Sequence, residues 1–123
     1  MNDDFLELGY IIEYNGIKLY HSGDSCIYEG LSRKISGIDV AMLPINGRDF
    51  YRHSKNIIGN MNSKEAIRLA HDVSAKLLIP MHYDMYKQNG ENPACFVSEL
   101  YDAGVDLPFH MFMPGERYIY TAD

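Results

Sequence analysis

Two side chains of the kinds that bind metals follow apolar, β-rich segments of this 123-residue chain. Asp24 comes after residues 17–21 and the dipeptide Ser22-Gly23, and His82 comes soon after residues 76–79. A carboxylate and an imidazole together suit Zn, Mn or Fe. Binding sites in open α/β sheets gather at the carboxyl ends of strands. The sequence therefore predicts that Asp24 and His82 lie on one edge of a sheet and bind a divalent metal.

Each of these residues also has an ordinary structural interpretation. Ser-Gly-Asp-Ser is common turn chemistry, and a histidine at a strand end is often only hydrogen-bonded. Tyr83 and Asp84 follow His82 and could hold its imidazole in place. The other histidines near strands and helices are predicted to be packed, supporting or exposed: His21, His71 and His110.

A second group of candidates lies in the polar, glycine-punctuated segment 45–61. Arg48, Arg52 and His53 lie close together there, and guanidinium groups match the geometry of carboxylates and phosphates. Long ordered loops in compact domains often carry function. These residues are predicted to bind an anionic group of a substrate, although a solvated loop with no ligand explains them equally well.

Composition excludes several classes of function. The net charge is −6 and no basic run occurs, which argues against nucleic acid and anionic membranes as partners. No apolar run approaches the roughly 20 residues of a membrane span. Cys26 and Cys95 are too few for a disulfide framework or a cysteine-rich zinc site. Without a signal peptide, the chain is predicted to be a cytoplasmic protein of one domain.

The first half of the chain has the pattern of a hairpin followed by a buried strand. Residues 10–14 and 17–21 are β-rich and are joined by Asn15-Gly16, which predicts a type I′ turn. Residues 28–35 predict a short helix, and the continuously apolar residues 38–44 predict a buried strand.

The second half has the pattern of helices that alternate with strands. Asn62 with Glu65 has capping-box spacing, and residues 63–74 carry an apolar helical face. The other predicted elements are a strand at 76–79 ended by Pro80, a helix at 93–103 stopped by Gly104, and strands at 108–113 and 117–121. Strand, helix and strand at this spacing favour parallel pairing. We expect an α/β layer, a mixed sheet with helices on one face.

The succession of these segments resembles a known family. The hairpin ends in Tyr-His-Ser-Gly-Asp-Ser, and Ile-Asp-Val-Ala-Met-Leu-Pro, Met-Asn-Ser-Lys-Glu-Ala and Ala-Lys-Leu-Leu-Ile-Pro-Met-His-Tyr-Asp follow in order. From about Gly9 to about Tyr86 this resembles the C-terminal half of a metallo-β-lactamase-fold hydrolase, closest to the branch of L-ascorbate-6-phosphate lactonase. The resemblance implies an αββα sandwich of two similar halves, with residues 1–123 forming a single partial domain, the C-terminal half.

The resemblance also implies a reaction. It places Asp24 as a carboxylate that bridges two metal ions and His82 as a ligand of one of them. The complete protein would hydrolyse a lactone or similar ester of a small anionic, sugar-like molecule with a metal-bound hydroxide. The family's His-x-His-x-Asp-His motif and its middle histidine do not occur in these residues.

Two expectations follow from those absent ligands. One Asp and one His do not complete a metal centre, so this chain alone is expected to be inactive, as a fragment of the hydrolase. It is expected to need a missing N-terminal half or to form a homodimer that covers its sheet. The alternative function is a non-catalytic α/β interaction or assembly module that retains remnants of the metal site.

Overall fold

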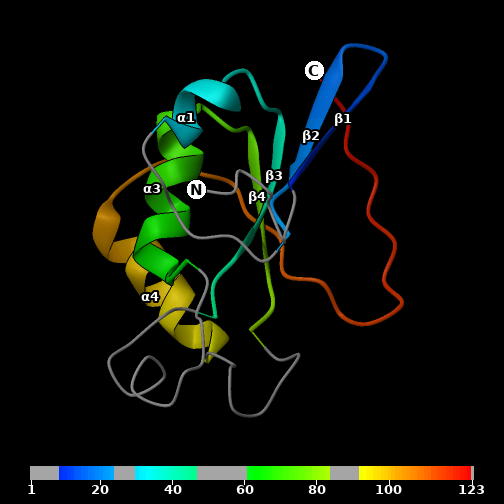
Figure 1. Cartoon of the computed structure of the whole chain (residues 1–123). Coiled ribbons are helices and arrows are strands. Elements are labelled where there is room, and N and C mark those ends of the chain that lie inside the picture. The colour runs from blue at the N-terminus through cyan, green and yellow to red at the C-terminus, as the bar shows by residue number, and fades with distance from the viewer. Residues whose placement is uncertain (1–8, 24–29, 47–60, 84–91, 123) are drawn as a thin grey trace, which may run out of the picture.

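The computed structural model describes residues 9–23, 30–46, 61–83 and 92–122. Its elements are β1 (Tyr10–Tyr14), β2 (Ile17–His21), α1 (Leu31–Lys34), β3 (Val40–Pro44), α3 (Ser63–Asp72), β4 (Leu77–Met81) and α4 (Pro93–Ala103). Within these residues the strands form one mixed sheet in the order β1-β2-β3-β4 (Figure 1). The helices there have at most 11 residues, too few to cross a bilayer.

The predicted hairpin is confirmed. β1 and β2 pair antiparallel, with Tyr14 opposite Ile17 next to the turn. Asn15 has φ 49° and Gly16 has φ 78°, and a type I′ turn requires positive φ at both positions. This turn fixes which residues of β1 face β2.

The parallel core of the sheet is also confirmed. β3 pairs parallel with β2 on one side and with β4 on the other. α1 is shorter than predicted and begins after Gly30, while residues 28–29 lie outside the described chain. Pro80 was predicted to end the strand, which is wrong, because β4 continues to Met81. Proline is tolerated there because β4 lies at the side of the sheet, where a missing N–H costs little.

Both longer helices begin and end as their sequences predict. The Asn62 side chain accepts the Glu65 N–H at 2.8 Å, and the Glu65 carboxylate accepts the Asn62 N–H at 3.1 Å, a complete capping box. α3 ends two residues earlier than predicted, at Asp72. α4 ends at Gly104, whose φ of 66° is left-handed, as expected of a glycine that stops a helix.

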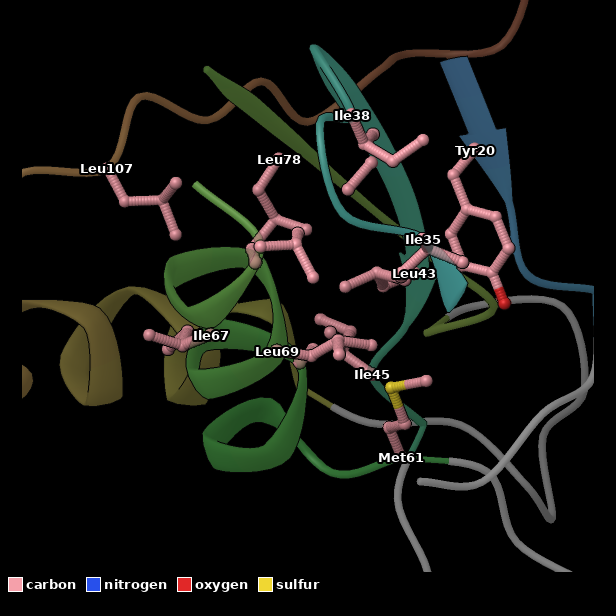
Figure 2. Close-up of a cluster of buried hydrophobic side chains, with 14 of the residues drawn as sticks. Tyr20, Ile35, Ile38, Leu43, Ile45, Met61, Ile67, Leu69, Leu78 and Leu107 are labelled. Atoms are coloured by element: carbon pink, nitrogen blue, oxygen red, sulfur yellow. The ribbon is translucent and has the colours of Figure 1, made fainter. Parts of the chain in front are cut away.

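The helices cover one face of the sheet, as predicted (Figure 1). Side chains from the helices pack there against Tyr20, Ala41, Leu43 and Leu78 of the strands. Figure 2 shows this main core, in which Leu69 of α3 points toward the strand residues and Ile67 lies on the other side of the helix. Within each strand every second residue faces this core, because successive side chains of a strand point to opposite faces of the sheet.

The opposite face of the sheet was expected to be bare, and the C-terminal segment covers part of it. Val40, Leu77 and Ile79 are buried there, and Phe112 and Tyr120 pack against them. Apolar side chains still exposed belong mainly to β1 and to the outer side of this segment: Tyr10, Ile11, Ile12, Tyr14, Met113, Tyr118 and Ile119.

The prediction of two strands at 108–113 and 117–121 is wrong. The described residues there make a single bridge, between Leu78 and Phe109. After that bridge, hydrogen bonds within a turn take the place of hydrogen bonds between strands. The Met113 N–H donates to the Glu116 carboxylate, and the Glu116 N–H donates to the Met113 carbonyl. Pro114 has no N–H to offer, so the chain turns instead of extending a strand.

Asp39, the residue before β3, interacts with Lys18 of β2 and with Lys76, the residue before β4. Its carboxylate accepts the Lys18 N–H at 2.8 Å and lies 3.3 Å from the Lys76 ammonium. The hydrogen bond from Lys18, with help from Lys76, holds the pKa of Asp39 below its ordinary 3.8, although burial opposes the shift. A lowered pKa in the folded state means that the carboxylate stabilises the fold above pH 3.8 and loses this effect as the pH falls through the folded pKa.

Asp39→Asn is therefore expected to lower stability at neutral pH by about 1 kcal/mol, because a charge-assisted hydrogen bond is weakened. The difference from the wild type should shrink as the pH falls below 3.8. Thermal unfolding followed by circular dichroism from neutral to acidic pH measures it. Asp72→Asn, at an exposed ion pair with Arg68, is the control and should change little. A difference for Asp39→Asn that grows toward low pH would contradict the assignment.

Candidate active site at the carboxyl edge of the sheet

The parallel strands β2, β3 and β4 all end on one edge of the sheet. Their last residues are His21, Pro44 and Met81. Backbone bonds continue past these ends, from Ser22 N–H to the Met42 carbonyl and from Ile45 N–H to the Met81 carbonyl. The segment that leads to Asp24 and the segment that holds His82 thus leave the sheet on the same edge. Asp24 itself lies outside the described residues.

His82 follows β4 directly and has a left-handed backbone, with φ 65°. This conformation costs a residue with a Cβ roughly 1–2 kcal/mol, and such strain is concentrated at functional sites. The Nδ1 atom of His82 is shielded from solvent, while the residue as a whole is partly exposed. Metal-binding histidines commonly hold one ring nitrogen against the protein and direct the other to the metal, and the shielding of Nδ1 would leave Nε2 for that role.

His21 shapes the turn at the end of β2. Its Nδ1 atom accepts the Gly23 N–H at 3.1 Å, so in the neutral ring the proton lies on Nε2. Gly23 has φ 63°, a conformation that glycine adopts without strain. The imidazole and the glycine together fix the turn at Ser22-Gly23, which precedes Asp24 in the chain.

The structure places some of the other candidates and not the rest. His71 is exposed on α3, and Cys95 is an exposed thiol on α4. His110 is partly buried but is not on a strand. The candidates that lie outside the described residues are Arg48, Arg52, His53, Asp84 and Cys26.

Two residues at the carboxyl edge were missed by sequence reasoning. Ser22 and Asn46 are each only 2% exposed, and they follow the ends of β2 and β3. Buried polar side chains are uncommon and need hydrogen-bond partners, so they often mark a site. The available signal was a polar residue within two positions of the end of a strand.

A pocket of about 420 Å³ lies beside His82. Met42 and Ile79 of the sheet and Phe112 of the C-terminal segment give it apolar walls, and the turn Met113–Glu116 forms another wall. A larger groove of about 530 Å³ lies between α3 and α4, among Lys64, Arg68, Glu99 and Asp102, and has no residue of the carboxyl edge. We therefore assign the smaller pocket to the candidate site.

A pair of side chains fixes the wall made by the turn. His110 Nε2 lies 2.7 Å from the Glu116 carboxylate, whose other oxygen accepts the Met113 N–H at 2.9 Å. The hydrogen bond from Met113 and then the one from His110 hold the pKa of Glu116 below its ordinary 4.5. The Tyr83 hydroxyl donates to the Phe112 carbonyl at 3.4 Å, which ties the same segment to the residue after His82.

The fit of these residues to a metal is partial. His82 has the position and the ring environment of a ligand. Across the ranges described, no three Asp, Glu, His or Cys side chains gather closely enough to hold an ion. Four ligands are usual in a closed zinc site and three in an open one, so further ligands must come from Asp24 and from residues beyond the described set.

Comparisons with known proteins agree with this fold. The sequence profile of the family described as "Beta-lactamase superfamily domain" matches residues 3–83. A "UPF0173 metal-dependent hydrolase" of Opitutus terrae is 34% identical over 110 residues, which are 88% of this chain and 43% of that protein. A protein of the same description from Rubrobacter xylanophilus is 29% identical over 113 residues, 89% of this chain and 43% of that protein.

A solved structure gives the same result at the level of the fold. Igni18, described as a metallo hydrolase from the archaeon Ignicoccus hospitalis, superposes with a TM-score of 0.73 at 23% identity. The match covers 94% of this chain and 46% of that one. The chain spans less than half the length of the curated relatives described above.

Proposed function

The chain belongs to the family of β-lactamase superfamily domains, and on this premise we propose that it forms the Asp24 and His82 part of the metal site in a metal-dependent hydrolase. The reaction is the opening of a lactone or a similar ester. The shared carboxyl edge of β2, β3 and β4 is the single observation that carries this proposal.

The ends of β2 and β4 are separated only by β3, so they lie about 10 Å apart. Asp24, which follows β2 in the chain, and His82, which follows β4, would supply a carboxylate and an imidazole to a metal centre at this edge. A divalent ion bound there, Zn, Mn or Fe, supplies a Lewis acid that activates water and polarises the scissile carbonyl.

Other residues of the chain have separate roles in the proposed site. His82 would hold metal, and His21 fixes the turn at Ser22-Gly23, which precedes Asp24 in the chain. The His110–Glu116 pair keeps the pocket wall in place and makes that wall acidic. An anionic group of the substrate would be repelled there, so in this proposal Arg48, Arg52 and His53 bind that group and the apolar pocket takes the uncharged part of the molecule.

Metal content tests the proposal. The purified chain, dialysed to equilibrium against buffer that contains Zn²⁺, Mn²⁺ or Fe²⁺, should hold more metal by elemental analysis than His82→Ala or Asp24→Ala does. His71→Ala is the matched control, because His71 is an exposed histidine on α3. Equal metal content in all four proteins, or a loss in His71→Ala as large as in His82→Ala, would refute the assignment.

A second candidate function is a non-catalytic assembly module that retains a remnant of the metal site. The observation in its favour is the lack of a three-ligand cluster among the described residues. Both readings expect no lactone hydrolysis by the isolated chain. Retention of metal through Asp24 and His82 favours the hydrolase, whereas a chain that binds none favours the module.

A further inference from the structure

The two outermost strands of the described sheet, β1 and β4, differ in whether a further segment hydrogen-bonds to their outer edge. At β4, Leu78 N–H bonds to the Pro108 carbonyl and His110 N–H bonds to the Leu78 carbonyl, so the C-terminal segment occupies that side. At the other side, β1 pairs only with β2 within the described chain, and all five of its residues are exposed. An exposed apolar edge strand is a template for pairing with another chain.

The hairpin turn decides which backbone groups of β1 point outward. In a two-residue hairpin the residues next to the turn, Tyr14 and Ile17, exchange hydrogen bonds. Bonding alternates along the strand, so Tyr10, Ile12 and Tyr14 direct their backbone groups toward β2. Ile11 and Glu13 therefore direct their N–H and C=O groups toward the open side.

We propose that β1 pairs antiparallel with β1 of a second copy of this chain, on a twofold axis at Ile12. In this register Ile11 of one copy lies opposite Glu13 of the other, and the two residues exchange the hydrogen bonds that β1 leaves open. The two sheets join into one continuous sheet. The contact is isologous, so it closes as a dimer and does not grow into a fibre.

The side chains of β1 are complementary to themselves in this register. Tyr10 of each copy meets Tyr14 of the other, and the two Ile12 side chains meet at the axis, all on one face. These are non-hydrogen-bonded pairs, in which side chains come closest and aromatic or β-branched partners stabilise most. On the other face each Glu13 lies opposite Ile11, so like charges do not face each other directly.

The size of the contact predicts a weak dimer. Tyr10, Ile12 and Tyr14 are 59%, 58% and 75% exposed. An aromatic side chain can bury about 150–250 Å², so each copy contributes on the order of 400 Å². The total of about 800 Å² is below the roughly 1,200 Å² of stable specific interfaces, so only weak, reversible association is expected.

Sedimentation velocity of the full chain from about 1 μM to about 1 mM tests the proposal in the range of weak association. The expected result is a reversible shift from monomer to dimer. Ile12→Lys should abolish the shift, because two ammonium groups would face each other on the axis. Ile12 is already exposed, so the melting temperature should not change. A mixture of Ile12→Lys and Ile12→Asp proteins should restore the dimer, because opposite charges then meet.

Ile119→Lys is the matched control, because Ile119 is likewise an exposed isoleucine, at 76%, and belongs to the C-terminal segment, outside β1. It should dimerise like the wild type. A wild type that stays monomeric at all concentrations overturns the proposal. So does a dimer that Ile119→Lys abolishes, which would mean face-to-face packing, or a mixture of the two Ile12 variants that does not pair. The proposal is independent of the metal site, so either can fail alone.

Discussion

Phe96→Ala is expected to lower the free energy of unfolding by about 3–5 kcal/mol, a large share of the 5–15 kcal/mol typical of a domain. Phe96 is fully buried on α4, and its ring meets that of Phe109 edge to face, with centroids 5.3 Å apart. Phe109 in turn forms the bridge to Leu78 of β4. Removal of the ring leaves a cavity where α4, the C-terminal segment and the sheet meet.

Urea unfolding followed by circular dichroism measures this loss. Val97→Ala is the control, because Val97 is the next residue of the same helix and is 43% exposed. Its cost should stay below about 1 kcal/mol, because only part of its side chain is removed from water on folding. If the two variants lost equal stability, the packing of α4 assigned to Phe96 would be wrong.

A pair of substitutions at His82 is expected to separate stability from metal binding. His82→Ala and His82→Gly both remove the imidazole, so both should lose all metal held through this residue. The backbone at His82 is left-handed, and only glycine adopts it without a steric cost. His82→Gly should therefore be more stable than His82→Ala by about 1 kcal/mol.

Urea unfolding of the metal-free variants measures the difference, and elemental analysis of the metal-loaded proteins measures binding. His71→Ala and His71→Gly form the matched pair, because His71 lies within α3. Glycine should be the less stable variant there, by at most about 1 kcal/mol because His71 lies in the last turn of α3, and this is the reverse of the order at His82. The same order at both positions would contradict the left-handed conformation of His82. Metal retained by His82→Gly would contradict its role as a ligand.

These two predictions have a common cause in the layering of the fold. The residues that stabilise most, such as Phe96, lie between the sheet and the helices, whereas the candidate site lies where the strands end. A substitution in the core between sheet and helices removes buried apolar area. A substitution at the strand ends removes a metal-ligating atom but little buried area. The site can therefore be altered without unfolding the chain, which makes the metal test informative.

Most of the fold followed from local sequence signals. The Asn15-Gly16 turn, the Asn62–Glu65 capping box and Gly104 each act within a few residues, so their effects could be read directly. The parallel order of β2, β3 and β4 followed from the alternation of strands and helices. The C-terminal residues were misjudged because their β-rich composition competes with the Met113–Glu116 turn, whose bonds come from one glutamate side chain.

The sequence by itself determined the elements, the family resemblance and the position of His82 directly after a strand, because periodicity, caps and turn residues act over short distances. The tertiary structure decided what depends on residues distant in the chain. It gave His82 a left-handed backbone, brought Phe112 and the Met113–Glu116 turn to the pocket beside it, and buried Ser22 and Asn46 at the same edge. Among the described residues it also left the outer side of β1 without a pairing segment while β4 received one, since pairing between strands depends on how distant segments pack.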